Sequence, residues 1–287
     1  MKSKMNLSKA GLFGIYAIAA AIVVFGLLAL SLTSCSTGGS GKDDFTTLEM
    51  IRVTGGTFTM GSPSSEPGRD NDETQHKVTL SGFYMGKFPV TQAQYEAVMG
   101  SNPSGFTEAV EGEKKAHLPV ENVTWFDAIR FCNKLSEQSK LEPVYTISGQ
   151  TVTADLGKNG YRLPTEAQWE YACRAGTSTA YSTGSISEAT GWYWETSDNR
   201  THEVGKKPAN AFGLYDMAGN VYEWCWDRYG AYATGAQTDP EGTATGDRRV
   251  LRGGAWPLSG ENLRSAYRGV GDPSYKDSFI GFRVVRP

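Results

Sequence analysis

The chain has 287 residues and a formal net charge of −3, from 28 Lys and Arg against 31 Asp and Glu. These charges form no long run of one sign, which argues against a nucleic-acid-binding surface, because such surfaces are basic. Glycine (34 residues), tyrosine (14) and tryptophan (7) are abundant, a composition typical of a fold with many turns and ordered loops filled by aromatic side chains.

The first 34 residues have the pattern of an export signal. Three lysines precede an apolar run over residues 10–32, which is also long enough to span a bilayer as a retained helix. The letters LTSC that follow, ending at Cys35, resemble the cleavage box of bacterial lipoproteins. We therefore expect residues 1–34 to be a lipoprotein signal peptide. Lipidated Cys35 would then anchor the protein to the membrane of the bacterial cell envelope, on its outer surface.

Residues 35–46 are small, polar and rich in glycine, and we expect them to form a flexible tether. Residues 47–287 are enough for one large domain, and the absence of a second linker of this composition favours a single one. Three cysteines remain in this part, Cys132, Cys173 and Cys225, and they cannot all pair. Since no C-x-x-C spacing occurs, buried free thiols are the expected state.

Capping patterns predict three helices. Thr91, Thr124 and Thr165 are candidate N-caps, and Gln94 and Gln168 stand three residues after the first and the third, where they complete a capping box. We therefore expect helices to follow all three threonines.

Gly100 and Gly176 are expected to end the first and third helices. The middle helix places five apolar residues on one face, Trp125, Ala128, Ile129, Cys132 and Leu135. Strand signals are short and broken by glycine, and residues 176–287 show no regular period. We expect ordered loops and short strands there.

Six segments occur in a characteristic order: NVTWFDAIRFCNKLS, YRLPTEAQWEYACRAG, NAFGLYDMAGNVYEWCWD, RVLRGGAW, RSAYR and GFRVVRP. Together they resemble the formylglycine-generating-enzyme (sulfatase-modifying factor) family over about residues 47–287. The resemblance implies an α+β domain with the C-type-lectin-like fold of the formylglycine-generating-enzyme type, with few short strands, two to three helices and much ordered loop. It also implies that Arg162 pairs with Glu166 or Glu170 in the interior.

The resemblance does not extend to the family's catalytic residues. Family enzymes carry two cysteines, five residues apart, after the Gly253–Gly254 pair, and these bind copper as thiolates. The matching positions here are Leu258 and Leu263, which offer no donor atom, so we expect no copper and no formylglycine-generating activity. Related iron enzymes need a cluster of three histidines, whereas those of this chain show no ligand spacing (His76, His117 and His202). We predict a protein that catalyses nothing and requires no cofactor.

Within residues 250–287 a regular frame alternates with residues that follow no period. The frame consists of Arg252, Gly253, Gly254, Arg264, Ser265, Ala266, Arg268, Pro273 and Ile280 to Arg283. This arrangement resembles the variable proteins of diversity-generating retroelements, including lipoproteins of the Treponema type, which diversify surface positions of this fold. Sixteen of the residues between the frame positions are expected to form an exposed, hypervariable face for a protein or glycan ligand: Ala255, Trp256, Pro257, Leu258, Ser259, Gly260, Tyr267, Gly269, Val270, Gly271, Asp272, Ser274, Tyr275, Asp277, Ser278 and Phe279.

Two alternatives stay open for the function. One is an invariant scaffold or maturation-complex lipoprotein with a pseudoenzyme domain, and the other is an unrecognised enzyme of the sulfatase-modifying-factor family. The resemblance also implies a structural calcium site at Asp216, Gly219, Val221 and Glu223, an oxygen-only set that suits Ca²⁺. The alternative for this segment is a tight turn in which both carboxylates make local hydrogen bonds.

Overall fold

The computed structural model describes residues 47–287, where the chain forms the expected mixture of helices, short strands and ordered loop. The predicted signal peptide and Cys35 lie outside these residues, and no helix within them is long and apolar enough to cross a membrane. The helices are α1 (Gln92–Met99), α2 (Trp125–Gln138) and α3 (Glu166–Arg174), with short 3-10 turns at Lys115–His117 and Gly260–Leu263. The strands are β1 (Met50–Val53), β2 (Gly56–Met60), β3 (His76–Leu80), β4 (Phe83–Gly86), β5 (Tyr145–Ser148), β6 (Thr151–Ala154), β7 (Tyr222–Arg228), β8 (Gln237–Thr238), β9 (Arg249–Arg252), β10 (Gly269–Gly271), β11 (Ile280–Gly281) and β12 (Val285–Arg286).

The predicted caps begin all three helices. Thr91, Thr124 and Thr165 each accept a hydrogen bond from the backbone N–H three residues on, and the side chain at that position accepts one from the threonine N–H. For α2 the returning side chain is Asp127, which the sequence prediction did not name. Helix α3 ends one residue earlier than expected: Ala175 is its left-handed C-cap, and Gly176, which follows, also has a positive φ of 89°.

The apolar face of α2 is confirmed. Trp125, Ala128, Ile129 and Cys132 are fully buried and Leu135 is 8% exposed. Cys132, Cys173 and Cys225 are all buried free thiols, as predicted. Their side chains fill the core as small apolar groups.

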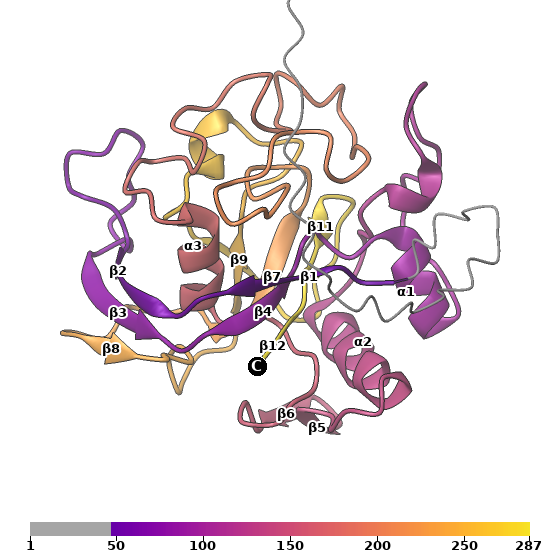
Figure 1. Cartoon of the computed structure of the whole chain (residues 1–287), viewed down its shortest axis with the longest axis horizontal. Helices are drawn as coiled ribbons and strands as arrows, with labels where there is room; N and C mark the ends of the chain where they lie inside the picture. Colours follow the sequence, from indigo (N-terminus) through magenta and orange to yellow (C-terminus); the bar gives the residue numbers. More distant parts are fainter. Residues whose placement is uncertain (1–46) are drawn as a thin grey trace, which may run out of the picture. The chain divides into compact units, whose positions relative to one another are not determined.

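The N-terminal strands form one long bent hairpin, drawn in indigo and purple in Figure 1. β1 pairs with β4 and β2 pairs with β3 in a single continuous register, with Met50 opposite Gly86 and Gly56 opposite Leu80. At the bend, a Cβ on Gly55 would lie 2.7 Å from the backbone nitrogen of Gly82. The two arms of the hairpin can therefore approach this closely only because residue 55 has no side chain. The bend allows one hairpin to enter two different sheets.

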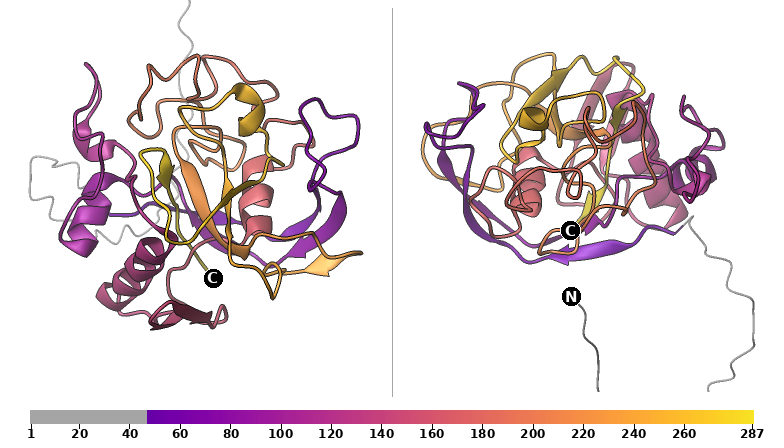
Figure 2. Two further views of the ribbon diagram at one scale, coloured as in Figure 1. Left: turned by 180° about the vertical axis from the view of Figure 1, so that it is seen from behind. Right: turned by 90° about the horizontal axis from the view of Figure 1, so that it is seen from above.

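The sheet that carries the C-terminal frame has the order β10-β9-β7-β11. Helix α3 packs against β7 and β9, and Figure 1 shows these strands in the middle of the domain between α3 and α2. The loops of residues 175–220 gather at one end, and both views in Figure 2 show the yellow C-terminal segments among them. The C-terminal segment therefore meets the long loops of the middle of the chain.

Candidate ligand-binding face

Four arginines of the C-terminal frame are buried in ion pairs. Arg252 and Arg283 have no exposed surface, Arg264 is 1% exposed and Arg268 is 6% exposed. Their carboxylate partners come from α3, β7 and the loop between β2 and β3: Glu170 for Arg252, Glu73 and Glu66 for Arg264, Glu166 for Arg268 and Glu223 for Arg283. The arginines of the frame are fixed because each neutralises a carboxylate that has no access to water.

Three of these pairs are bidentate, including that of Arg264 with Glu73. Arg268 donates to both oxygens of Glu166 at 2.7 and 2.9 Å, and Arg283 donates to both oxygens of Glu223 at 2.6 and 2.7 Å. Such paired hydrogen bonds fix orientation as well as distance. They hold the C-terminal segment in one position on the sheet.

The predicted partners of Arg162 are wrong. Its guanidinium donates to the side-chain oxygen of Gln168 at 2.8 Å and to the carbonyl of Leu163. Glu166 and Glu170, which lie one helical turn apart on α3, bind the frame arginines instead. Helical spacing placed both carboxylates on one face of α3, but only the tertiary fold decides which arginine reaches that face.

The paired glycines after Arg252 are required by backbone geometry. Gly253 and Gly254 have φ values of 94° and 69°, which only glycine adopts without strain. A Cβ on Gly254 would also lie 2.6 Å from the side chain of Leu263. This turn directs the chain from β9 into the residues of the expected face.

Most residues between the buried anchors reach the surface. Tyr275 is 46% exposed and Val270 is 38% exposed, two of the few large apolar side chains in residues 47–287 that are so accessible. Ser259, Asp272 and Ser274 are also exposed, and the half-buried members are Trp256, Pro257, Leu258, Gly260, Tyr267, Asp277, Ser278 and Phe279. We call these thirteen residues the C-terminal face.

Three residues expected in this face are buried and belong to the frame. Ala255 has no exposed surface and lies in the core. Gly269 and Gly271 point inward from β10, where a Cβ would lie 3.0 Å from Leu251 or 2.6 Å from the ring of Trp224. Strand alternation explains the error, because β10 turns only Val270 outward.

Two aromatic residues outside the C-terminal segment extend the face, and the sequence prediction missed both. Trp194 is 59% exposed, and its backbone N–H donates to the carbonyl of Leu258 at 2.9 Å. Phe106 packs edge-on against Trp256 with ring centroids 5.5 Å apart. The aromatic run GWYW around Trp194 was the available signal, but the sequence does not show that it meets Leu258.

The two positions that match the family's cysteines carry no chemistry of that kind. Leu258 is half-buried and packs against the hydrophobic core, and Leu263 is 1% exposed and lies beside Gly191 and Gly254. Burial raises the pKa of the thiol in Cys132, Cys173 and Cys225, which keeps all three protonated and unreactive. No thiolate is therefore offered near the face by the described residues.

The two carboxylates of the expected calcium site both accept hydrogen bonds from the protein. Glu223 is fully buried, and its oxygens accept from Arg283 and from the indole N–H of Trp169 at 2.7 Å. Asp216 accepts from the N–H of Gly205 at 2.7 Å through one oxygen only, and burial raises its pKa to about 6. Glu223 thus bonds residues distant in the sequence rather than local ones, and the second oxygen of Asp216 has no hydrogen-bond partner. The calcium site stays a prediction.

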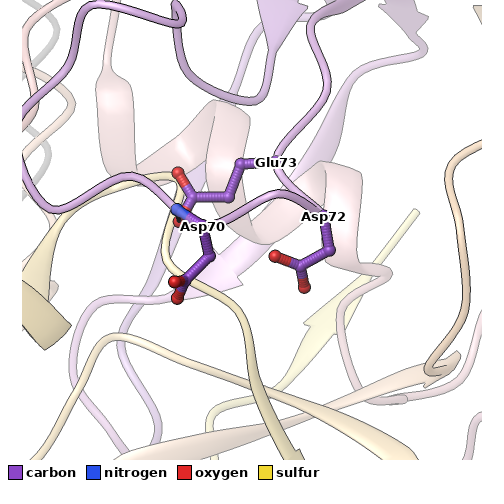
Figure 3. A group of neighbouring side chains, drawn as sticks. All are labelled: Asp70, Asp72 and Glu73. Atoms are coloured by element: carbon purple, nitrogen blue, oxygen red, sulfur yellow. Dashed lines mark hydrogen bonds between the residues drawn. The ribbon is translucent and has the colours of Figure 1, made fainter.

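A second acidic group lies in the loop between β2 and β3, where Figure 3 shows Asp70, Asp72 and Glu73 side by side. Glu73 is fully buried and accepts from Arg264 with both oxygens, at 2.7 Å each. Burial alone would raise the pKa of Glu73, but hydrogen bonds from Arg264 and Ser62 outweigh it and hold the pKa below the usual value. This group therefore serves as an anchor for the frame.

The histidines are scattered, as predicted, and two of them join loops. His117 lies 2.6 Å from Glu203, and His202 lies 2.9 Å from Glu113 while its ring stacks on Trp192. These buried pairs connect the loop before α2 to the loop that carries Trp194. In the part of the chain that the structure describes, these two histidines therefore have a structural role.

A buried carboxyl behind the face predicts a pH dependence of stability. Glu121 has no exposed surface, accepts from the N–H of Phe106 at 2.8 Å, and has a second oxygen without a hydrogen-bond partner. Burial, with a contribution from Asp277, raises its pKa to about 7. Because the folded pKa lies above the unfolded one, its contribution is fully present below about pH 4.3 and is lost as the pH rises through about 7.

We therefore expect Glu121→Gln to stabilise the domain relative to wild type by about 1–3 kcal/mol more at pH 8 than at pH 5. Urea unfolding at the two pH values measures this difference. The control is Glu96→Gln on the exposed side of α1, which should follow the wild-type pH profile. If the stability of Glu121→Gln and of wild type changed in parallel with pH, the raised pKa of Glu121 would be contradicted.

Comparisons with known proteins agree with this architecture. The profile of the sulfatase-modifying factor enzyme 1-like domain matches residues 39–287. Treponema denticola variable protein 1 has a similar structure, with a TM-score of 0.78 and 38% identity, covering 83% of this chain and 95% of that chain. The chaperone protein LppX of Paenibacillus barcinonensis is 37% identical over 292 residues, 89% of this chain and 94% of its own.

An enzyme is also among the relatives. The formylglycine-generating enzyme of Mus musculus is 29% identical over 289 residues, covering 86% of this chain and 77% of its own. Both resemblances predicted from the sequence, to this family and to the variable proteins, are confirmed. The expected fold of the formylglycine-generating-enzyme type is confirmed as well.

Proposed function

Since the chain belongs to the sulfatase-modifying factor enzyme 1-like family, we propose that it is a non-catalytic member that binds a protein or glycan through its C-terminal face. One observation carries the proposal: the frame arginines are buried in ion pairs, while the residues between them reach the surface. Such a segment can change its exposed side chains without changing its backbone. Trp256, Tyr267 and Tyr275 supply the stiff aromatic contact area that binding surfaces use.

The positions of the family's cysteines support a function without catalysis. Leu258 and Leu263 offer no ligand for copper, and the three thiols of the described domain are buried elsewhere. Oxidation of a sulfatase-derived peptide by the purified, copper-loaded protein would contradict this part of the proposal.

We further propose display on the outer surface of the bacterial envelope, with a lipid on Cys35 and a tether formed by residues 35–46. The pattern of basic residues, apolar run and LTSC supports it. Mass spectrometry of the mature N-terminus should find an acylated Cys35, and Cys35→Ser should abolish lipid labelling. A mature protein that begins elsewhere without a lipid contradicts the anchor and leaves the binding proposal in place.

Diversification by a retroelement completes the proposal, supported by the similarity to a Treponema denticola variable protein. The test is deep sequencing of codons 250–287, with the adjacent DNA, in a growing population. We expect changes at exposed positions such as Ser259, Val270 and Tyr275, directed by a nearby near-copy of the segment. Codons for the buried frame, including Ala255 and Gly271, should stay constant.

A second candidate is an invariant scaffold lipoprotein, favoured by the 37% identity to a chaperone protein. Invariant codons throughout the segment, with no near-copy, would support this candidate and exclude a diversified face. Changes spread equally over Arg252, Arg264 and Arg283 would contradict both, because the buried pairs could not survive them.

A further inference from the structure

Two arginines face each other across β7 and β9 without a carboxylate partner. Arg228 and Arg249 are directly opposite in the antiparallel ladder, so their side chains leave the same face of the sheet. Within residues 47–287 neither forms an ion pair within 4.0 Å; Arg228 donates to the carbonyl of Gly246 and Arg249 to that of Trp226. The four frame arginines, by contrast, all have carboxylate partners.

Like charges directly opposite in a sheet repel each other, and this pair is close enough to do so. Arg249 is 7% exposed, and burial together with the charge of Arg228 lowers its pKa to about 10. Asp227 offsets part of this effect through its charge, but the fold still holds the Arg249 guanidinium without an ion-pair partner. An added negative charge there would relieve the repulsion.

The guanidinium of Arg249 is oriented by two tryptophans. Its central carbon lies 3.8 Å from the ring centroid of Trp125 and 5.1 Å from that of Trp226. Stacking covers the flat faces of the group and leaves its edge for hydrogen bonds, and that edge presents N–H donors in a fixed plane. One of these donors reaches Trp226, and the others have no partner among the described residues.

Both arginines line one cavity of about 360 Å³. Its other walls are Phe126, residues 150–152 around β6, Asp247, and the segment Asp272 to Ser274. One carboxylate oxygen of Asp272 accepts hydrogen bonds from the backbone N–H and the hydroxyl of Ser274, at 2.8 and 2.5 Å. Asp247 is exposed. The acidic lining residues therefore leave the two guanidinium groups available.

We propose that this cavity, the arginine cavity, binds an oxyanion between Arg228 and Arg249. The ligand class is a carboxylate, phosphate or sulfate group, since planar guanidinium donors match the spacing of its oxygens. The site shares Asp272 and Ser274 with the C-terminal face, but it does not rest on the proposed function. Binding of a small anion can be measured whether or not the face takes a macromolecule.

Isothermal titration calorimetry of the purified full chain, with sodium sulfate, phosphate and acetate in separate arms at constant ionic strength, tests the site. We expect saturable binding in at least one arm and at least tenfold weaker binding by Arg228→Gln. The matched control is Arg130→Gln, an exposed arginine on α2 that pairs with Asp127, which should bind like wild type. The anion that binds most tightly identifies the ligand class.

Thermal unfolding provides a second readout that does not depend on calorimetric heat. In chloride, Arg228→Gln should melt at or above the wild-type temperature, because it removes the repulsion from Arg249. When the anion that binds is added, the melting temperature of the wild type should rise more than that of the variant. This difference separates binding at the site from the general stabilisation that sulfate gives all proteins. Equal increases in melting temperature for both proteins, or no saturable binding of any anion, would overturn the proposal.

Discussion

Replacing Arg283 with methionine is expected to destabilise the domain by about 3–5 kcal/mol. The substitution keeps most of the side-chain volume but leaves Glu223 fully buried with only the indole N–H of Trp169 as a partner. It also removes the donors to the carbonyls of Gly86 and Tyr215. An uncompensated buried charge accounts for most of the loss, and urea unfolding at pH 7 measures it.

Two further variants separate this charge effect from lost packing. Adding Glu223→Gln to Arg283→Met removes the stranded charge and keeps an acceptor for Trp169, so the double variant should be more stable than Arg283→Met alone. Lys115→Ala breaks the exposed pair with Glu108, whose side chains are 56% and 82% exposed, and should cost at most about 1 kcal/mol. If Arg283→Met costs no more than Lys115→Ala, the buried pairs do not hold the frame.

Gly219→Ala is expected to destabilise the domain by at least about 3 kcal/mol, the cost of strain at a forbidden backbone conformation with a steric clash added. Gly219 has a φ of 93°, and a Cβ there would lie 2.7 Å from the carbonyl carbon of Trp192 and closer still to its oxygen. The same residue donates to the carbonyl of Gly253 at 2.8 Å. One turn thereby holds the Trp194 loop and the C-terminal face together.

Gly213→Ala is the matched control for this prediction. Gly213 has a similar φ of 82°, but a Cβ there meets nothing within 4 Å. The free energy of unfolding should therefore fall only by the cost of backbone strain at a positive φ, about 1–2 kcal/mol. Thermal unfolding of the two variants measures the difference, and equal losses would show that the close approach to Trp192 does not matter.

Local chemistry made the helices predictable. A capping box needs two side chains three residues apart, so Thr91 with Gln94 and Thr165 with Gln168 are visible in the sequence. The apolar face of α2 follows from helical spacing in the same way. The left-handed Ala175 was missed because Gly176, which follows it, is the commoner residue at such an end.

The C-terminal face was only partly predictable, because burial depends on contacts distant in the sequence. The frame marked where the anchors lie, but nothing in it distinguishes Val270, which points outward, from Gly269 and Gly271, which point into the core. A strand of three residues is too short to show its alternation. Likewise, Trp194 joins the face through a hydrogen bond to Leu258, 64 positions along the chain, which no local pattern encodes.

Every carboxylate that holds the frame is synthesised before its arginine. The separations are 60 residues for Glu223 and Arg283, 102 for Glu166 and Arg268, and 191 for Glu73 and Arg264. A chain that stops early, or shifts its reading frame within the last 40 or so codons, leaves these carboxylates stranded in an incomplete core. We expect such products to fail to fold and to be degraded, so a gene altered in this segment yields a stable protein only when translation reaches the end in the correct frame.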